Sequence, residues 1–313
     1  MHSATDWAAA NLLQIKFLLV GLFLASAFYV HFRGRVRHGF GRQLTDHSTF
    51  LAPVNAFFYM FSRVPSQPFL EERDFPELRT LTENWQTIRE EGLRLLDDGY
   101  VRAAAAYNDL GFNSFFRTGW KRFYLKWYGD PLPSAELMCP KTVALLNALP
   151  NVHGAMFAML PPDGRLVRHR DPFAGSLRYH LGLSTPNSDD CFIEVDGVRR
   201  GWRDGAAMIF DETFIHYAEN KTQQNRLILF CDVDRPLWGA IPRAVSHFIS
   251  NHIVKATATQ NIEGERVGIA NRAFGAVYQV RLLGKRLKKW NRKVYYAVKY
   301  AIVAAAAALI VLH

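Results

Sequence analysis

Cysteine is scarce in this sequence, with three residues in 313: Cys139, Cys191 and Cys231. Thiols this few and this scattered exclude a disulfide framework and a cysteine-rich zinc motif. Cys191 and Cys231 lie in apolar, strand-like runs, so we predict buried thiols in a reducing compartment. The sequence also lacks internal repeats, and its only low-complexity tract is an alanine run near the C-terminal end.

Acidic residues are also in short supply. The 28 Asp and Glu residues face 38 Lys and Arg residues, which gives a net charge of +10. This imbalance favours an anionic partner, either a membrane surface or nucleic acid. No aromatic and basic platform of recognisable spacing accompanies the charge, so we predict a membrane and no nucleic acid. With 49% hydrophobic residues, the chain can form one core plus membrane segments.

The N-terminal region contains one long apolar run, Leu12 to Val30, interrupted only by Gln14 and Lys16. As a helix it is about long enough to cross ~30 Å of hydrocarbon. It has no charged region before it and no small-residue cleavage site after it, so we expect an uncleaved anchor over residues 1–31 rather than a signal peptide. Arginines follow at once, and the positive-inside tendency places the next domain in the cytoplasm.

The C-terminal region repeats this pattern more weakly. Val294 to Leu312 is apolar except for Lys299. We predict a transmembrane helix over residues 294–313, with an interfacial or buried helix as the alternative. Residues 241–293 form a basic amphipathic region whose charges suit anionic headgroups. Both ends therefore predict the same topology, two anchors with the body between them on the cytoplasmic side, and no obligate protein partner is expected.

Between the anchors, residues 32–118 are expected to be a membrane-proximal linker followed by helices. Prolines at four positions between residues 43 and 76 should break any regular element there, and the aromatics of that segment should pack on the domain or dip into the interface. Residues 77 to 108 show helical spacing. Cys139 to Leu149 should be another helix, since Pro140 introduces it and Pro150 ends it.

From His153 the pattern changes to short strands separated by turns such as Asp196-Gly197. The predicted strands are His153–Leu160, Arg165–Asp171, Leu177–Leu183, Cys191–Val195, Ala206–Phe210 and Arg226–Val233. Short, evenly spaced strands after helices predict an α+β fold. Its core, residues 119–240, should be a double-stranded β-helix, the jelly-roll or cupin-like barrel, with flanking helices and N- and C-terminal transmembrane helices.

Three side chains of this core could form a metal site. If His169 and Asp171 lie on one strand, positions i and i+2 point to the same face, so an imidazole and a carboxylate converge. His216, from a later strand, would complete two nitrogens and one oxygen on one face of an octahedral ion. The open face is typical of non-heme Fe(II) oxygenases. The alternative is a histidine satisfied by hydrogen bonds alone, because His-X-Asp is a short pattern.

Arg226 adds a second binding function. It follows His216 by ten residues, so we expect it to face the site from the neighbouring strand. Its planar guanidinium can hold a carboxylate through two parallel hydrogen bonds. A cosubstrate with two carboxylate ends, such as 2-oxoglutarate, fits a metal at one end and Arg226 at the other.

Four stretches carry a resemblance to a known family. They are Gly119-Trp120-Lys121, Cys139-Pro140-Lys141-Thr142, Leu177 to Leu183 and Gly205 to Asp211. With His169, His216 and Arg226 in the expected order, the region from about Gly119 to Pro236 resembles the aspartyl/asparaginyl β-hydroxylases. These are Fe(II)- and 2-oxoglutarate-dependent dioxygenases. Within that family it is most similar to the membrane-bound bacterial lipid A 2-hydroxylases.

The resemblance assigns roles to individual residues. It implies that His169 and His216 bind iron, that Arg226 anchors 2-oxoglutarate, and that Arg178 and His180 lie near the cosubstrate and substrate. Two positions depart from the peptide-hydroxylating animal enzymes. Those enzymes have glycine where this chain has Asp171, so the full triad His169, Asp171 and His216 is expected here. Their helper serine falls on Ala158, so Arg226 must find another hydroxyl or a water.

The function implied by the resemblance is hydroxylation of C2 of a secondary acyl chain of lipid A at the inner membrane. Fe(II) would be the metal cofactor, 2-oxoglutarate and O2 would be consumed, and succinate and CO2 would be released. The alternatives are a peptide aspartyl/asparaginyl hydroxylase, a metal-binding membrane protein without catalysis, and a nucleic-acid-binding membrane protein. The arginines at 165, 168 and 170, and those at 199, 200 and 203, are expected on solvated strand faces, with phosphate binding as the alternative. His153, His247 and His252 are expected to be structural.

Overall fold

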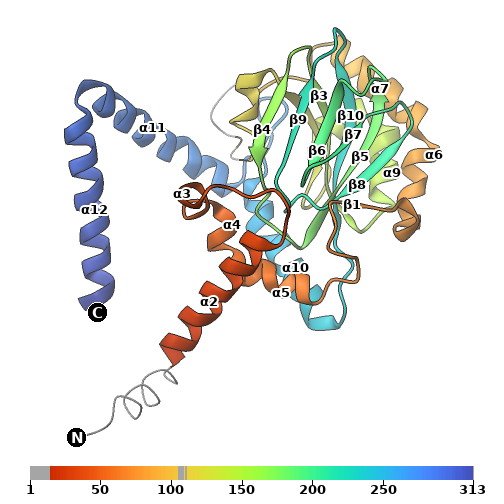
Figure 1. Ribbon diagram of the computed structural model, residues 1–313. Coiled ribbons are helices and arrows are strands. Elements are labelled where there is room, and N and C mark those ends of the chain that lie inside the picture. The colour runs from red at the N-terminus through yellow and green to blue at the C-terminus, as the bar shows by residue number, and fades with distance from the viewer. Residues whose placement is uncertain (1–14, 105–108, 110, 313) are drawn as a thin grey trace, which may run out of the picture.

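Two antiparallel sheets face each other at the centre of the molecule (Figure 1). The computed structural model describes residues 15–104, 109 and 111–312. The larger sheet has the order β1-β8-β5-β10-β3-β2 and the smaller one β4-β9-β6-β7. The strands are β1 Phe69–Leu70, β2 Lys121–Trp127, β3 Val152–Leu160, β4 Arg165–His169, β5 Ser176–Ser184, β6 Cys191–Val195, β7 Val198–Gly201, β8 Ala207–Phe210, β9 His216–Asn220 and β10 Arg226–Asp234. The predicted α+β core is confirmed.

The central strands of the larger sheet are buried on both faces. On β10, Leu227, Leu229 and Cys231 pack in the core cluster shared with the helices. The alternate residues Ile228 and Phe230 pack in the second cluster, between the two sheets. Because side chains alternate along a strand, one run of apolar residues can supply both cores. The expectation of buried thiols at Cys191 and Cys231 is confirmed.

Helices cover the outer face of the larger sheet and extend beyond the barrel. The helices are α2 Ile15–Phe32, α3 Phe40–Gln43, α4 His47–Phe50, α5 Ala52–Met60, α6 Arg79–Glu83, α7 Trp85–Asp97, α8 Pro133–Met138, α9 Pro140–Asn147, α10 Ala240–Ile249, α11 Ile269–Trp290 and α12 Arg292–Leu312. Helices α6, α7 and α9 lie against the larger sheet, while α11 and α12 project away from it (Figure 1). The predicted helical region 139–149 is largely helical, and the region 77–108 is helical as far as Asp97, while residues 105–108 lie outside the described residues.

A turn and a close approach between backbones show why particular residues are needed at two positions of the sheets. Asp196 and Gly197 both have positive φ, 50° and 83°, which is the geometry of the tight turn that joins β6 to β7. Gly182 lies on β5, where an added Cβ would sit 2.0 Å from the carbonyl oxygen of Arg203. Only glycine allows that backbone to approach so closely.

The segment before the barrel differs from the prediction. Residues 43–76, expected to be an irregular linker, contain α4, α5 and the edge strand β1. Pro53 lies in the first turn of α5, where proline does not interrupt the helix. Phe58 is fully buried and meets Phe173 edge to face. The aromatics of α5 therefore pack on the domain.

The two predicted membrane spans are not confirmed. Leu12, Leu13 and Gln14, the first residues of the N-terminal span, lie outside the described residues. In the part of the chain that the structure describes, no helix is both long enough and apolar enough to cross a membrane. The C-terminal helix α12 also begins with Arg292 and Lys293 and contains Lys299, which lowers its apolar character.

Candidate metal centre

Strand pairing brings the two predicted histidines together. His169 ends β4 and His216 begins β9, and the two are direct partners across this antiparallel pair. Their ring centroids are 4.2 Å apart. A register shift between Leu166 and His169 produces this alignment. β9 was not among the predicted strands, because its first residue, His216, has only Tyr217 and Ala218 as apolar followers.

Asp171 reaches the same point from a loop and not from a strand. β4 ends at His169, so the expected same-face spacing along one strand is wrong. The backbone N–H of Asp171 instead donates to the carbonyl of Glu212, at 2.9 Å, which docks the loop beside β9. His169 Nε2 then lies 3.5 Å from Asp171 Oδ1. One ligand atom from each of His169, Asp171 and His216 lies within 4.8 Å of the others.

Both imidazoles are oriented for metal binding through Nε2. His169 Nδ1 lies 2.6 Å from the carbonyl of Val167, and His216 Nδ1 lies 2.9 Å from that of Phe214. A proton donated from Nδ1 to a carbonyl leaves the Nε2 lone pair free, as a metal-binding histidine requires. Burial lowers the pKa of His169 to about 4 and also lowers that of His216. The neutral ligand form of both rings is therefore favoured at neutral pH.

Arg178 holds the carboxylate of the triad in place. Its guanidinium contacts Asp171 and Glu212, and its Nη1 lies 3.0 Å from Asp232 Oδ1. Arg178 and Asp232 are direct partners across β5 and β10. The sequence reasoning singled out neither Glu212 nor Asp232. Asp232 carried a usable signal, since a carboxylate within an apolar strand needs a partner.

One guanidinium cannot neutralise three carboxylates, and their pKa values separate accordingly. Burial would raise the pKa of Asp171, but Arg178 and the two imidazoles outweigh it and lower that pKa. Burial, followed by the neighbouring carboxylates, raises the pKa of Glu212 and of Asp232. Asp171 is therefore the member that stays ionised, as an oxygen ligand to a metal must.

Arg226 enters the cavity from the opposite sheet. It begins β10 of the larger sheet, whereas His216 lies on β9 of the smaller one, so the expectation that it comes from the neighbouring strand is wrong. Its guanidinium stacks on Trp202, with Cζ 4.3 Å from the ring centroid. Among the described residues, its buried Nε and Nη2 have no hydrogen-bond partner. A buried cation with free donors suits an anionic ligand, and a carboxylate fits its fork.

His180 supplies a neutral donor beside Arg226. Trp202 Nε1 donates to His180 Nδ1 at 3.4 Å, which assigns the proton of the neutral ring to Nε2. Burial and then the Arg226 cation lower the pKa of His180 well below 6.5. Nε2 has no partner among the described residues. Of the two helpers expected in place of the serine missing at Ala158, a hydroxyl or a water, no described residue that lines the cavity supplies the hydroxyl.

The walls of the cavity are otherwise apolar. The apolar lining residues are Phe112, Phe115, Trp120, Ala158, Leu166, Ile193, Trp202, Phe210, Ala218, Ile228 and Phe230. The six predicted site residues, His169, Asp171, Arg178, His180, His216 and Arg226, line the same cavity. The structure thus brings all six together inside a largely apolar wall: three that can hold a divalent cation and three that can orient a small anion.

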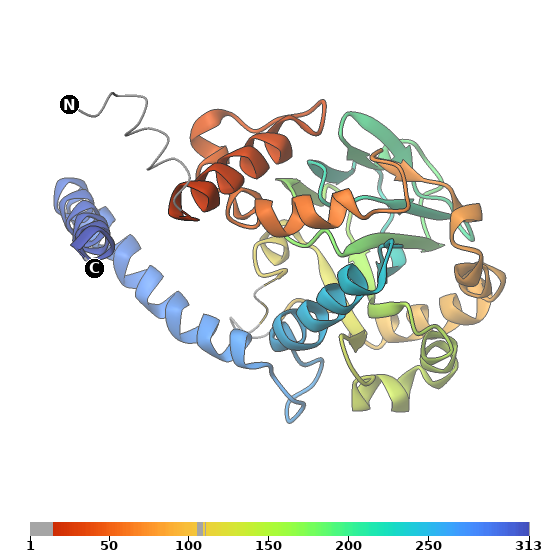
Figure 2. The same cartoon turned by 90° about the horizontal axis from the view of Figure 1, so that it is seen from below.

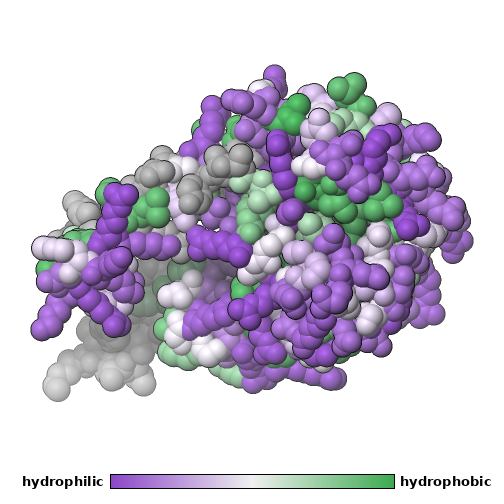
Figure 3. Space-filling model, turned by 90° about the horizontal axis from the view of Figure 1, so that it is seen from above, coloured by the Kyte–Doolittle hydropathy of each residue, from purple (hydrophilic) through white to green (hydrophobic). Residues whose placement is uncertain are grey.

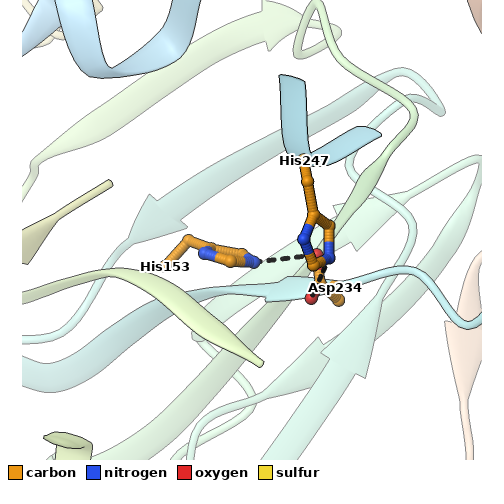
Figure 4. Close-up of side chains that lie close together, drawn as sticks. All are labelled: His153, Asp234 and His247. Atoms are coloured by element: carbon orange, nitrogen blue, oxygen red, sulfur yellow. Dashed lines mark ion pairs between the residues drawn. The ribbon is translucent and has the colours of Figure 1, made fainter. Parts of the chain in front are cut away.

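A second histidine and aspartate cluster lies elsewhere. His153 of β3 and His247 of α10 flank Asp234 at the end of β10 (Figure 4). His153 Nε2 is 2.9 Å from Asp234 Oδ1, and His247 Nε2 is 3.7 Å from Oδ2. Neither Nδ1 has a recorded partner in the described part of the chain, unlike those of His169 and His216. These ion pairs join α10 to the barrel, in line with the structural role expected for both histidines.

The flanking arginines divide between two environments. Arg165, Arg168, Arg199 and Arg200 are exposed, as the solvated interpretation expects. Arg170 is buried, which corrects that interpretation for its position. Its Nη1 donates to the carbonyl of Val30 at the end of α2, at 3.1 Å.

The chain is similar to several known proteins. Residues 82–236 match the family described as Aspartyl/Asparaginyl beta-hydroxylase. An ornithine lipid ester-linked acyl 2-hydroxylase of Rhizobium tropici is 34% identical over 167 residues, which are 53% of this chain and 56% of that protein. An aspartyl/asparaginyl beta-hydroxylase of Mus musculus is 30% identical over 186 residues, 57% of this chain and 24% of that protein.

The chain therefore spans about half of the first relative and a quarter of the second. Among solved structures, a Pseudomonas putida prolyl-4-hydroxylase aligns at 17% identity with a TM-score of 0.32, over 50% of this chain and 88% of that one. A likeness this slight adds nothing to the topology described above.

Proposed function

The chain belongs to the aspartyl/asparaginyl β-hydroxylase family through residues 82–236, and we therefore propose that it is an Fe(II)- and 2-oxoglutarate-dependent dioxygenase that hydroxylates C2 of a membrane-lipid acyl chain. One observation carries the proposal. Two imidazole nitrogens and one carboxylate oxygen converge in a cavity that also contains the guanidinium of Arg226, whose Nε and Nη2 have no partner among the described residues.

In this proposal His169, Asp171 and His216 hold Fe(II) on one face, and the cavity side stays open. The carbonyls of Val167 and Phe214 keep both imidazoles in the binding tautomer. Arg178 keeps Asp171 ionised and turned toward the histidines. When bound, Fe(II) and 2-oxoglutarate supply the oxidising chemistry, in which O2 is consumed, succinate and CO2 leave, and a C–H bond becomes C–OH.

Arg226 and His180 position the cosubstrate. The Arg226 fork binds one carboxylate of 2-oxoglutarate, and His180 Nε2 donates a hydrogen bond in place of the absent serine hydroxyl. Stacking on Trp202 holds the Arg226 plane in one orientation before the ligand arrives. The other end of the cosubstrate then points to the metal ligands.

The apolar cavity wall suits an acyl chain as the substrate, and the protein's net charge of +10 suits an anionic headgroup. We propose C2 of a secondary acyl chain of lipid A, on the cytoplasmic side of the bacterial inner membrane. The basic surface suits its phosphates. The Rhizobium tropici relative, named for an ester-linked acyl chain of ornithine lipid, supports an acyl substrate and supplies the second lipid to test.

Lipid mass analysis tests this function. The full chain would be expressed in a strain whose lipid A lacks 2-hydroxylated chains and which makes ornithine lipid. We expect a mass gain of one oxygen on a lipid A acyl chain, lost in a folded His216→Ala variant. A gain of one oxygen on ornithine lipid alone would identify ornithine lipid, and not lipid A, as the substrate. Unchanged lipids, or a fully active His216→Ala enzyme, would refute the proposal.

A peptide hydroxylase is the second candidate, favoured by the similarity to the Mus musculus enzyme. The carboxylate of Asp171 sets this chain apart from the glycine that the resemblance implies for those enzymes. Hydroxylated aspartate or asparagine in peptides incubated with the purified chain, with lipids unchanged, would favour this candidate.

A further inference from the structure

Helix α10 has its apolar side outward. Ile241, Val245 and Phe248 are 73%, 36% and 59% exposed, and they follow one another at four- and three-residue steps along one side of α10, while Trp238, just before the helix, is 61% exposed. The opposite side carries Ser246, which is buried against the barrel. A helix on a water-facing surface normally has its apolar stripe on the core. The outer side of α10 is therefore built for an apolar environment.

Two other helices with exposed apolar side chains lie near α10. Seen from below, α5 lies between α2 and α10 on the near side of the barrel (Figure 2). Phe58 of α5 and Leu237, which precedes α10, belong to one buried cluster, so the helices are packed together. Phe28 on α2 and Met60 on α5 are strongly exposed. We call these outward side chains the lower face: Phe28, Met60, Trp238, Ile241 and Phe248.

The opposite side of the molecule has a different surface. Viewed from above, hydrophilic side chains predominate around a smaller hydrophobic area (Figure 3). The lower face instead carries large exposed apolar side chains on neighbouring helices. Such side chains gathered on one side of a folded protein mark an interaction site.

The chain around the lower face is almost free of acid. Residues 7–70 contain a single acidic residue, Asp46, and residues 235–262 contain none. The Asp46 side chain accepts from the N–H of Ser48 and so caps α4. Arg63 lies over Trp238, with Cζ 4.8 Å from the ring centroid. An apolar face with a basic, acid-poor surround complements an anionic lipid surface, and tryptophan is a usual residue at that boundary.

The same helices hold the loop that carries a proposed metal ligand. Arg170 donates to the carbonyl of Val30 at the end of α2. Asn55 of α5 donates to the carbonyl of Pro172 and accepts from the N–H of Ala174. Asp171 therefore lies in a loop that α2 and α5 hold through hydrogen bonds.

We propose that the lower face docks on an anionic lipid bilayer, independently of any membrane span. The inference extends the proposed function and rests on its lipid substrate, but it requires no turnover. Ser246 of α10 is buried, and His247 Nε2 lies 3.7 Å from Asp234 at the end of β10, so α10 lies against the barrel with Ile241 and Phe248 exposed.

A single-cysteine fluorescence experiment tests the contact. The three native thiols are buried, so an environment-sensitive maleimide dye will label an introduced cysteine in the full chain. Ile241→Cys and Phe248→Cys place the dye on the lower face. Leu137→Cys on α8, 83% exposed, is the matched control away from that face. The labelled proteins are mixed with vesicles of phosphatidylglycerol and phosphatidylethanolamine, or of phosphatidylcholine alone.

We expect the emission at 241 and 248 to rise and shift to shorter wavelength with the anionic vesicles, and the emission at 137 to stay unchanged. The shift should weaken with phosphatidylcholine. No shift at 241 and 248 while the protein floats with the vesicles would overturn the proposal. So would a shift without vesicles that grows with protein concentration, which would identify a second copy as the occupant. A His216→Ala background separates this result from catalysis.

Discussion

Replacing Arg226 by methionine should stabilise the ligand-free protein and abolish binding of 2-oxoglutarate. The guanidinium is 2% exposed, and its Nε and Nη2 have no partner among the described residues. Methionine has a similar length, is apolar and can fill irregular core space. The substitution therefore removes a charge that burial opposes and that only a ligand can satisfy.

The magnitude follows from the perturbed pKa. Burial lowers the pKa of Arg226 from 12.5 to about 10, which corresponds to roughly 3 kcal/mol against the buried cation. Stacking on Trp202 returns about 1–2 kcal/mol. We therefore expect the free energy of unfolding of ligand-free Arg226→Met to exceed that of the wild type by about 1–3 kcal/mol. At about 2–4 °C per kcal/mol, the Tm should rise by several degrees.

The assay is thermal and denaturant unfolding of the full chain with and without 2-oxoglutarate. In the wild type, ligand at about 100 times its Kd should add about 2.7 kcal/mol, and in Arg226→Met it should add nothing. Arg122→Met is the matched control. Arg122 is equally buried, but its Nε pairs with Asp109 at 3.0 Å, so its loss strands a buried carboxylate. That variant should lose about 3–5 kcal/mol.

Two results would refute this reasoning. One is an Arg226→Met protein that is less stable than the wild type without ligand. The other is a variant that 2-oxoglutarate still stabilises, since Arg226 would then not be its anchor.

Three further outcomes are expected. Arg178→Met should cost roughly 3–5 kcal/mol in denaturant unfolding and weaken iron binding about 10–100-fold in a chelator competition, and unchanged iron affinity would contradict its positioning role. Gly182→Ala should cost at least about 3 kcal/mol, because its Cβ would meet the Arg203 carbonyl oxygen at 2.0 Å, and a near-neutral melting curve would show that β5 can shift. Burial and then Arg42 lower the pKa of His38 to about 4, so the neutral imidazole stabilises the fold fully above pH 6.5, and this stabilisation is lost as the pH falls toward 4. The free energy of unfolding of the wild type should therefore fall by about 1–3 kcal/mol over that range. In denaturant unfolding at a series of pH values, His38→Gln should show a weaker dependence on pH.

Local patterns predicted the parts of the fold that depend on neighbouring residues. The turn at Asp196 and Gly197 was found because few residues accept positive φ at two successive positions. Strand β6, Cys191–Val195, has the predicted bounds. Helix α9 begins at Pro140, as the proline signal indicated. Each of these signals lies within a few residues of the structure it specifies.

The chemistry of the candidate site was also readable without coordinates. Two histidines, one aspartate and one arginine indicated nitrogen and oxygen ligands with a carboxylate anchor. Their geometry was not readable, because it depends on pairing between distant strands. The loop position of Asp171 comes from its hydrogen bond to Glu212, and the direction of Arg226 comes from its place on the opposite sheet.

The sequence by itself determined the ligand types, the strand periodicity and the excess of positive charge, since these follow from residue identity and short spacing. Only the tertiary structure decided which face of β10 meets the cavity, because both faces of that strand are apolar and buried. It also decided that α10 turns Ile241 outward and Ser246 inward. A helical period indicates that residues share a side, but the surroundings decide which side meets the core.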